Sequence, residues 1–208
     1  YSCNNLIYLN IQIYRINFIS YFQLITFSDI LLLAFLNRMN LSDINTTLIV
    51  DFDSTFVKLE GLEELAKIAL QGNPRKHEII KEIEDVTNDG MSGRMSFESS
   101  LEKRLKLFQA NESNINNLIT LLDANITDSI LRNKDFFNIN ANNIYIISGG
   151  FENWILPIVK PFGIPSDHVL SNKFIFDNDK NIIGIDTNIP LCKSGGKSLC
   201  VNSLNIIC

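Results

Sequence analysis

The apolar and polar residues divide the chain into strand-like stretches on either side of a helical one. Residues 47–50 and 144–147 are short apolar runs rich in β-branched residues, which is typical of buried strands. Between about 60 and 122, apolar residues recur at helical spacing, as in Leu62, Leu65, Ala66 and Ala69. The pattern predicts an α/β fold, with a Rossmann-like parallel sheet and a helical cap inserted after the first strand.

Finer signals give the expected limits of the elements within this helical stretch. A charged helix at 75–86 is expected to end in a turn at 88–90, where Asn, Asp and Gly follow one another. Ser96 is the expected N-cap of a helix that runs to Phe108, and Ser113 is the expected N-cap of a helix at 115–122.

The chain returns to alternating elements after the second predicted strand. Gly149 and Gly150 favour a tight turn, followed by a helix at 152–162 that contains Pro157, which favours a kink. Residues 173–176 and 182–185 flank a polar turn and predict a hairpin. A final helix is expected to begin at Lys197.

Residues 1–38 differ in composition from the rest of the chain. Residues 16–36 are long enough to span a membrane, but Gln23 and Asp29 interrupt them. A central Asp costs about 2.5–3.5 kcal/mol on insertion. We therefore expect Met39 to be the natural start and 1–38 to be upstream sequence. An apolar membrane anchor in this segment is the alternative.

Composition and charge exclude some classes of function. The chain has 208 residues, of which 46% are hydrophobic and 20% are charged, which suits a globular protein. A net charge of −5 argues against nucleic-acid binding, which needs clustered Lys and Arg. The four cysteines (Cys3, Cys192, Cys200 and Cys208) show no metal-binding spacing, so we expect free thiols in the reducing cytoplasm.

The candidate chemistry lies directly after the first predicted strand, at Asp51 and Asp53. Open α/β sheets bind ligands at the carboxyl ends of their strands. Two carboxylates at such a place need a cation or a hydrogen-bond network to compensate them. The alternative interpretation is a polar turn in which these residues cap a helix.

Several further motifs follow in a fixed order. Glu60 comes shortly after Asp-Phe-Asp-Ser-Thr at 51–55. Met91, Phe97 and Arg104 lie within GMSGRMSFESSLEKRLKL, a strand ends in IYIISGGF at 144–151, and Lys197 lies in SGGKSL. From about 46 to 203, this ordered set resembles the haloacid-dehalogenase-like phosphatases, in particular the phosphoserine phosphatase branch.

The resemblance implies an enzyme of serine biosynthesis that hydrolyses O-phospho-L-serine to serine and phosphate. It implies that Asp51 is the nucleophile and forms an aspartyl-phosphate, while Asp53 is the general acid and then the base. Magnesium would be held by Asp51 and the backbone carbonyl of Asp53. The family's fourth motif, a Gly-Asp-rich loop, supplies a third metal ligand, which is expected beyond Cys208.

The remaining residues would bind the substrate. The resemblance implies that Ser148, the amide of Gly149 and Lys197 bind the phosphate. It further implies that Glu60 takes the substrate ammonium, that Arg104 takes its carboxylate, and that Met91 and Phe97 close the pocket. The core would comprise 39–59 and 135–208, and the cap 60–134. The strand at 47–50 would lack one parallel neighbour.

Each residue also has a simpler interpretation. Glu60 suits the first turn of a solvated helix, Arg104 lies in a charge run typical of a solvated face, and Ser148 begins an ordinary turn. Lys193 could replace Lys197, and His77 and His168 suit surface positions. Three alternatives for the whole chain are a phosphatase for another small phosphomonoester, part of a fusion with another serine-pathway enzyme, and a non-catalytic remnant.

Overall fold

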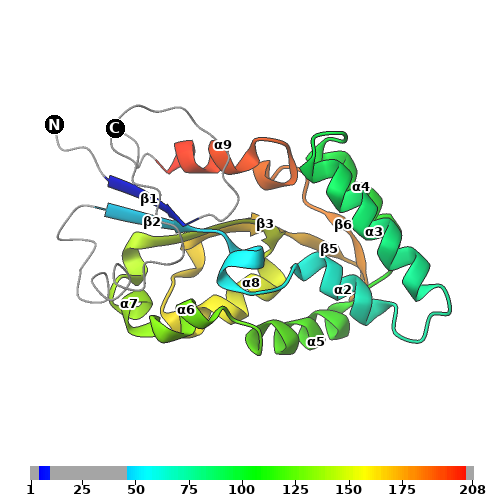
Figure 1. The fold of residues 1–208 in the computed structure, drawn as a ribbon, viewed down its shortest axis with the longest axis horizontal. Helices are drawn as coiled ribbons and strands as arrows, with labels where there is room; N and C mark the ends of the chain where they lie inside the picture. Colours follow the sequence, from blue (N-terminus) through cyan, green and yellow to red (C-terminus); the bar gives the residue numbers. More distant parts are fainter. Residues whose placement is uncertain (1–4, 10–45, 205–208) are drawn as a thin grey trace.

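The computed structural model describes residues 5–9 and 46–204, and its central feature is a parallel sheet (Figure 1). The strand order is β1-β2-β3-β4, and each neighbouring pair is parallel. The strands are β1 (Asn5–Leu9), β2 (Thr46–Val50), β3 (Ile144–Phe151) and β4 (Val169–Asn172). The prediction of an α/β fold with a parallel sheet is confirmed.

Helices follow and separate these strands. They are α2 (Gly61–Ala69), α3 (Lys76–Met91), α4 (Phe97–Lys106), α5 (Glu112–Asp123), α6 (Asp128–Arg132), α7 (Lys134–Ile139), α8 (Glu152–Val159) and α9 (Gly196–Ser203). The predicted hairpin is confirmed as an antiparallel pair of β5 (Phe174–Phe176) and β6 (Ile182–Ile185). The helix expected at 152–162 ends at Val159 and continues as a single 3-10 turn.

Apolar side chains pack on both faces of the sheet, because neighbouring residues of a strand point to opposite sides. Leu48 and Val50 of β2 belong to the large core on the α8 side, whereas Ile49 packs with Val201 of α9 on the other side. Strands that are buried on both faces are continuous apolar runs. This explains why 47–50 and 144–147 could be recognised in the sequence.

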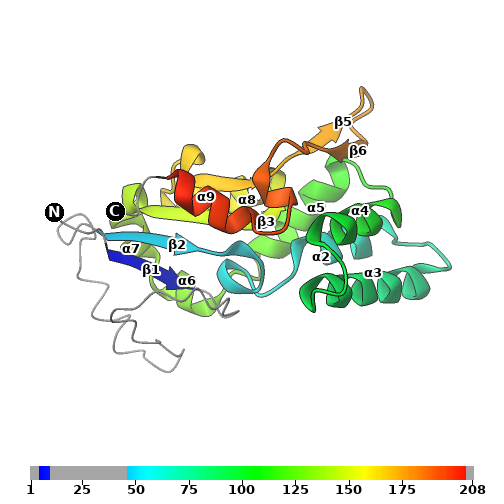
Figure 2. The same ribbon diagram turned by 90° about the horizontal axis from the view of Figure 1, so that it is seen from above.

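The carboxyl ends of β2 and β3 point toward the end of the molecule where α2, α3 and α4 lie (Figure 2). Helix α2 packs against α5, and α5 packs against α8 beneath the sheet. The helices α2, α3, α4 and α5 are called the cap helices. The chain therefore places a set of helices beside the edge of the sheet where ligands bind in this class of fold.

Strand β1 corrects one expectation about the sheet. It pairs with β2 along its whole length, from Asn5 opposite Thr46 to Leu9 opposite Val50. The strand at 47–50 therefore has a parallel neighbour on each side, and the expected free edge was wrong. The candidate membrane stretch 16–36 and Met39 lie outside the described residues. Among the residues that are described, no helix is long and apolar enough to cross a bilayer.

Two expectations about the cap helices were also wrong. Helix α3 continues through the expected turn at 88–90, because α4 packs closely against it there. A Cβ on Gly90 would lie 2.8 Å from the hydroxyl of Ser100, and that hydroxyl donates to the carbonyl of Val86 (3.0 Å). Tertiary packing thus overrides the local turn signal.

The second wrong expectation about the cap helices concerns the N-cap of α5. Ser96 caps α4 as predicted, accepting from the amide of Ser99 (3.2 Å). Helix α5 is capped by Asn111 and not by Ser113. The Asn111 side chain accepts from the Asn114 amide, and the Asn114 side chain accepts from the Asn111 amide, each at 3.0 Å. An asparagine pair thus replaces the usual Ser–Glu capping box.

Candidate active site

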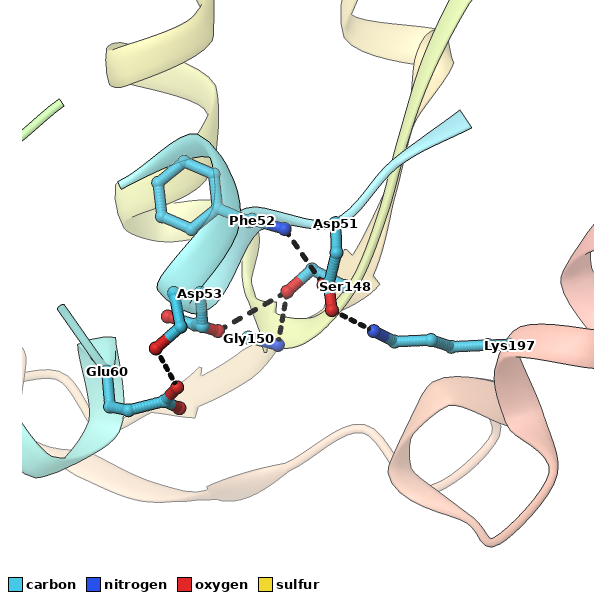
Figure 3. A network of polar contacts seen from close by, with 8 residues as sticks. Asp51, Phe52, Asp53, Glu60, Ser148, Gly150 and Lys197 are labelled. Atoms are coloured by element: carbon cyan, nitrogen blue, oxygen red, sulfur yellow. Dashed lines mark hydrogen bonds and ion pairs between the residues drawn. The ribbon is translucent and has the colours of Figure 1, made fainter. Parts of the chain in front are cut away.

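Asp51 lies where β2 ends, and both of its carboxylate oxygens have partners (Figure 3). Oδ1 accepts from the amide of Phe52 (2.8 Å), and Oδ2 accepts from Nζ of Lys197 (2.5 Å). One oxygen therefore caps the tight turn at Phe52–Phe56, as the simpler interpretation expects. The other oxygen meets a cation from the far end of the chain, which a turn alone does not explain.

Asp53 lies on the same turn but in different surroundings. Its Oδ1 accepts from the amide of Gly61 (2.8 Å), and its Oδ2 accepts from the hydroxyl of Ser148 (3.4 Å). Burial, helped by the negative charge of Glu60, raises its pKa from 3.8 to about 7. The two carboxyl groups thus differ: one lies against an ammonium, and the other retains its proton near neutral pH.

The end of β3 supplies the next residues of the site. Ser148 accepts from the amide of Gly150 (2.9 Å) and is fully buried. The expected tight turn at Gly149 and Gly150 was wrong, since both belong to β3. Glycine is needed at 150 for a different reason. A Cβ there would lie 2.9 Å from Oδ2 of Asp53 and 3.2 Å from Oγ of Ser148.

Lys197 reaches Asp51 from the first turn of α9. Two glycines precede it and set its direction. Gly195 has a positive φ of 77°, and a Cβ on Gly196 would lie 2.1 Å from the carbonyl oxygen of Pro190. Glycine is required at 196 for this close approach, and it favours the left-handed conformation at 195. Of the two candidate lysines, Lys197 is the one that pairs with Asp51.

The cap helices contribute residues of opposite charge. Glu60 directly precedes α2, is exposed, and accepts from the hydroxyl of Ser54 (2.5 Å). Arg104 of α4 is only 9% exposed, so the interpretation of its charge run as a solvated face was wrong at this residue. Its Nε donates to the carbonyl of Ser100 (3.3 Å), and its guanidinium approaches the hydroxyl of Thr87 (3.5 Å).

The electrostatic surroundings of Arg104 tie it to the site. Burial lowers the pKa of Arg104, while the carboxylates of Glu63, Glu60 and Asp53 oppose this shift. Burial also raises the pKa of Glu63, whose side chain accepts a hydrogen bond from Thr87. The guanidinium of Arg104 is therefore close enough to the site to interact electrostatically with its acidic groups.

The two apolar candidates of the cap lie in different surroundings. The ring of Phe97 lies over Gly149, with Cζ 3.1 Å from the place that a Cβ on Gly149 would take. Met91 ends α3 and is 53% exposed. His77 is exposed as expected, but His168 is not a free surface residue, because its ring stacks on Tyr145 and contacts the Ile144 carbonyl (3.0 Å).

Sequence reasoning missed three residues that hold the site together. Asn172 is fully buried at the end of β4, and its amide donates to the carbonyls of Gly149 (2.8 Å) and Leu191 (3.3 Å). Gly61 provides the amide that binds Asp53. The buried indole of Trp154 lies against Gly61, so a Cβ there would be 2.8 Å from Nε1. A polar residue that ends an apolar strand was the available signal for Asn172.

The donor chemistry of the site suits a hard divalent cation. Asp51 and Asp53 offer carboxylate and backbone oxygens, the ligands that magnesium prefers. Within the described residues, no group of three or more His, Cys, Asp or Glu side chains is placed to hold a metal. This part of the chain therefore fits the oxygen donors of such an ion but does not by itself complete a protein cage.

Comparison with known proteins places the chain in a family. No family model matches it. Phosphoserine phosphatase of Drosophila melanogaster is 30% identical over 148 residues, which are 71% of this chain and 52% of that protein. The chloroplastic phosphoserine phosphatase of Arabidopsis thaliana is 30% identical over 154 residues, or 74% and 50%. The chain thus spans about half the length of these curated relatives.

Solved structures agree with this placement. A phosphoserine phosphohydrolase-like protein from Francisella tularensis has a TM-score of 0.63 and 30% identity, covering 74% of this chain and 73% of that one. A substrate-bound phosphoserine phosphatase complex, at 23% identity and a TM-score of 0.57, shows the same fold. The chain belongs to the haloacid-dehalogenase-like phosphatases, in the phosphoserine phosphatase branch.

Proposed function

We propose that the protein hydrolyses O-phospho-L-serine to serine and phosphate in a magnesium-dependent reaction in the cytoplasm. The observation that carries this proposal is the difference between the two carboxyl groups of the site. Asp51 lies against Lys197, whereas Asp53 is partly buried and its pKa is raised to about 7. Two carboxyl groups held in different protonation states can act as nucleophile and acid in one reaction. The names of the relatives support the same activity.

The first step is transfer of the phosphoryl group to Asp51. A carboxylate oxygen of Asp51 forms a bond to phosphorus while the bond from phosphorus to the serine oxygen breaks. Asp53 gives its proton to the departing oxygen, so that serine leaves as a neutral alcohol. In the second step, Asp53 takes a proton from water. The resulting hydroxide attacks phosphorus, which releases phosphate and restores Asp51.

The surrounding groups stabilise the negative charge of the phosphoryl group. Ser148 and the amide of Gly149 are proposed to bind its oxygens, and Lys197 balances its charge together with that of Asp51. Asp51 and the backbone carbonyl of Asp53 would hold the magnesium ion, which supplies further positive charge next to the phosphoryl oxygens. Asn172 donates to the carbonyl of Gly149 and so helps to orient the end of β3.

Recognition of an amino acid is assigned to the cap helices. Glu60 is proposed to bind the ammonium of the substrate, and Arg104 its carboxylate. Phe97, which lies over Gly149, would cover the phosphate end of the pocket, and Met91 would contribute from the end of α3. Substrate choice would therefore come from residues that take no part in bond making.

A substrate series tests this proposal. Phosphate release should be magnesium-dependent, and it should be fastest with phosphoserine. Phosphoethanolamine, which lacks the carboxylate, and 3-phosphooxypropionate, which lacks the ammonium, should both react more slowly. Arg104→Met should lower kcat/KM for phosphoserine by roughly a hundredfold and for phosphoethanolamine by less than about threefold, because only one substrate offers the carboxylate. Lys103→Met, at an exposed neighbour, is the control. Equal losses with both substrates would contradict the role of Arg104.

A further inference from the structure

The start of α4 is joined to the loop before Lys197 by three hydrogen bonds that the proposed mechanism does not use. The amide of Phe97 donates to Oγ of Ser194 (3.2 Å). The amide of Ser194 donates to Oε1 of Glu98 (2.9 Å), and its hydroxyl donates to Oε2 (3.1 Å). Glu98 and Ser194 are almost a hundred residues apart, so the contact joins a cap helix to the core.

Each side of this contact carries residues of the candidate site. Helix α4 holds Phe97 over Gly149 and contains Arg104 two turns further on. On the other side, Ser194 is followed directly by Gly195 and Gly196, whose geometry aims Lys197 at Asp51. Only two residues therefore separate Ser194 from Lys197, and the second of them, Gly196, is packed closely against the backbone of Pro190.

The chemistry of the contact favours a specific latch over a chance surface pair. Glu98 lies in the first turn of α4, where the positive end of the helix dipole favours a carboxylate. Its two carboxylate oxygens accept hydrogen bonds from the amide and the hydroxyl of Ser194. This bidentate arrangement fixes both the distance and the direction between the two residues. Its own backbone amide, followed by that of Ser194, holds the pKa of Glu98 below its usual range.

We propose that Glu98 and Ser194 are positioning residues. They form a latch that sets the cap helix α4 and Lys197 at one fixed separation, so that substrate recognition and charge balance at the phosphoryl group depend on each other. The consequence for catalysis rests on the proposed function, whereas the latch itself does not. Neither residue touches the reacting atoms.

Hydrogen exchange tests the latch without any substrate. Glu98→Ala and Ser194→Ala should each raise the exchange rate of the amides at 96–99 and at 193–197 by about tenfold, because each removes two of the three hydrogen bonds. Glu102→Ala, in the same helix and paired only with Lys106 on the exposed face, is the matched control and should leave both segments unchanged. Unchanged exchange at 193–197 in Glu98→Ala would overturn the proposal.

Kinetics test the consequence for the reaction. Loss of the latch should raise KM for phosphoserine by about fivefold, through α4, and should lower kcat for p-nitrophenyl phosphate by a similar factor, through Lys197. The double variant should be no worse than either single variant, and Ser194→Thr should restore both values, because it keeps the hydroxyl. A lower Tm with unchanged kcat and KM, or additive losses, would overturn the coupling.

The two arms separate failure of the latch from failure of the proposed function. If the parent protein releases no phosphate from phosphoserine, the proposed function fails, and the exchange rates alone decide whether the latch exists. If the parent protein is active and exchange changes only on the mutated side of the contact, the latch fails and the proposed function stands.

Discussion

The end of the sheet and the cap helices build their parts of the site in different ways. At the sheet, Asp51 and Ser148 come directly after or within parallel strands that lie side by side, so the strand ends alone bring them together. In the cap, Glu60 directly precedes α2 and Arg104 lies in α4, so their positions depend on how those helices pack. The first arrangement is fixed by topology, whereas the second can be adjusted by small shifts of helices.

The tolerances of the two regions differ accordingly. At the sheet, Gly150 leaves no room for a Cβ beside the carboxyl group of Asp53. In the cap, the nearest atom to Gly149 is the tip of the Phe97 ring, which a side-chain rotation can move. If the residues around Asp53 are rigid and the cap residues that face the substrate can shift, substrate choice can change without disturbing the chemistry.

The largest expected effect comes from removing the proposed nucleophile at the sheet end. Asp51→Asn should lower phosphate release by at least roughly a thousandfold, because an amide of the same shape cannot attack phosphorus. Circular dichroism and Tm should show an intact fold. Asp123→Asn, at an exposed site on α5, should keep the parent activity. Residual turnover near the parent rate would rule out Asp51 as the nucleophile.

Adjacent glycines allow a direct comparison of the two regions. Gly150→Ala should lower kcat by about a hundredfold, because the new methyl group displaces the carboxyl group of Asp53. Gly149→Ala meets only the movable ring of Phe97 and should lower kcat by less than about tenfold. Steady-state kinetics would measure kcat for both variants and for the parent protein. Similar losses in kcat would show that the surroundings of Gly149 and Gly150 are equally rigid.

The buried carboxyl group of Asp53 should make stability depend on pH. Its folded pKa of about 7 exceeds the usual value of 3.8, so unfolding releases a proton between these values and stability falls as pH rises from about 4 to 7. Asp53→Asn removes this dependence. In metal-free buffer, the stability of the variant relative to the parent should therefore rise by about 3 kcal/mol over this range and then level off. Urea titrations at several pH values measure this difference, and a constant difference would contradict the assigned pKa.

The smallest expected effect concerns the cap alone. Asn111→Ala removes the N-cap of α5 and should cost about 1 kcal/mol of stability, while kcat changes by less than about twofold. Ser113→Ala, at the residue first expected to cap this helix, should cost less than about 0.5 kcal/mol. The Tm values of the two variants provide the measurement. A greater loss with Ser113→Ala would overturn the capping assignment.

The sequence predicted the strands and the residues at their ends because short apolar runs and strand termini are local signals. Asp51 and Ser148 were found in this way together with the family resemblance, and Lys197 was found from the resemblance alone. It did not predict that Arg104 is buried, because its neighbours Glu102 and Lys103 look like a solvated face. It also placed a turn at 88–90, where packing of α4 on α3 extends the helix.

The residues that were missed depend on contacts between distant segments. Asn172 donates to carbonyls 23 and 19 residues away, and no local pattern records such a link. The need for glycine at 61 and 150 likewise arises from Asp53 and Trp154, which approach from other elements. Local patterns and the family resemblance thus pointed to the proposed reacting groups, whereas the groups that hold them in place became visible only in three dimensions.

The buried indole of Trp154 gives this chain a built-in optical reporter. It is the only tryptophan in the sequence, it is fully buried, and it lies against the glycine that binds Asp53. Excitation at the red edge of the protein's absorption therefore addresses one ring beside the site. A carboxyl group that changes its charge a few ångströms from an indole changes the intensity of its emission. Titration of Asp53 can consequently be followed in the unlabelled protein by a change in light emission, independently of turnover.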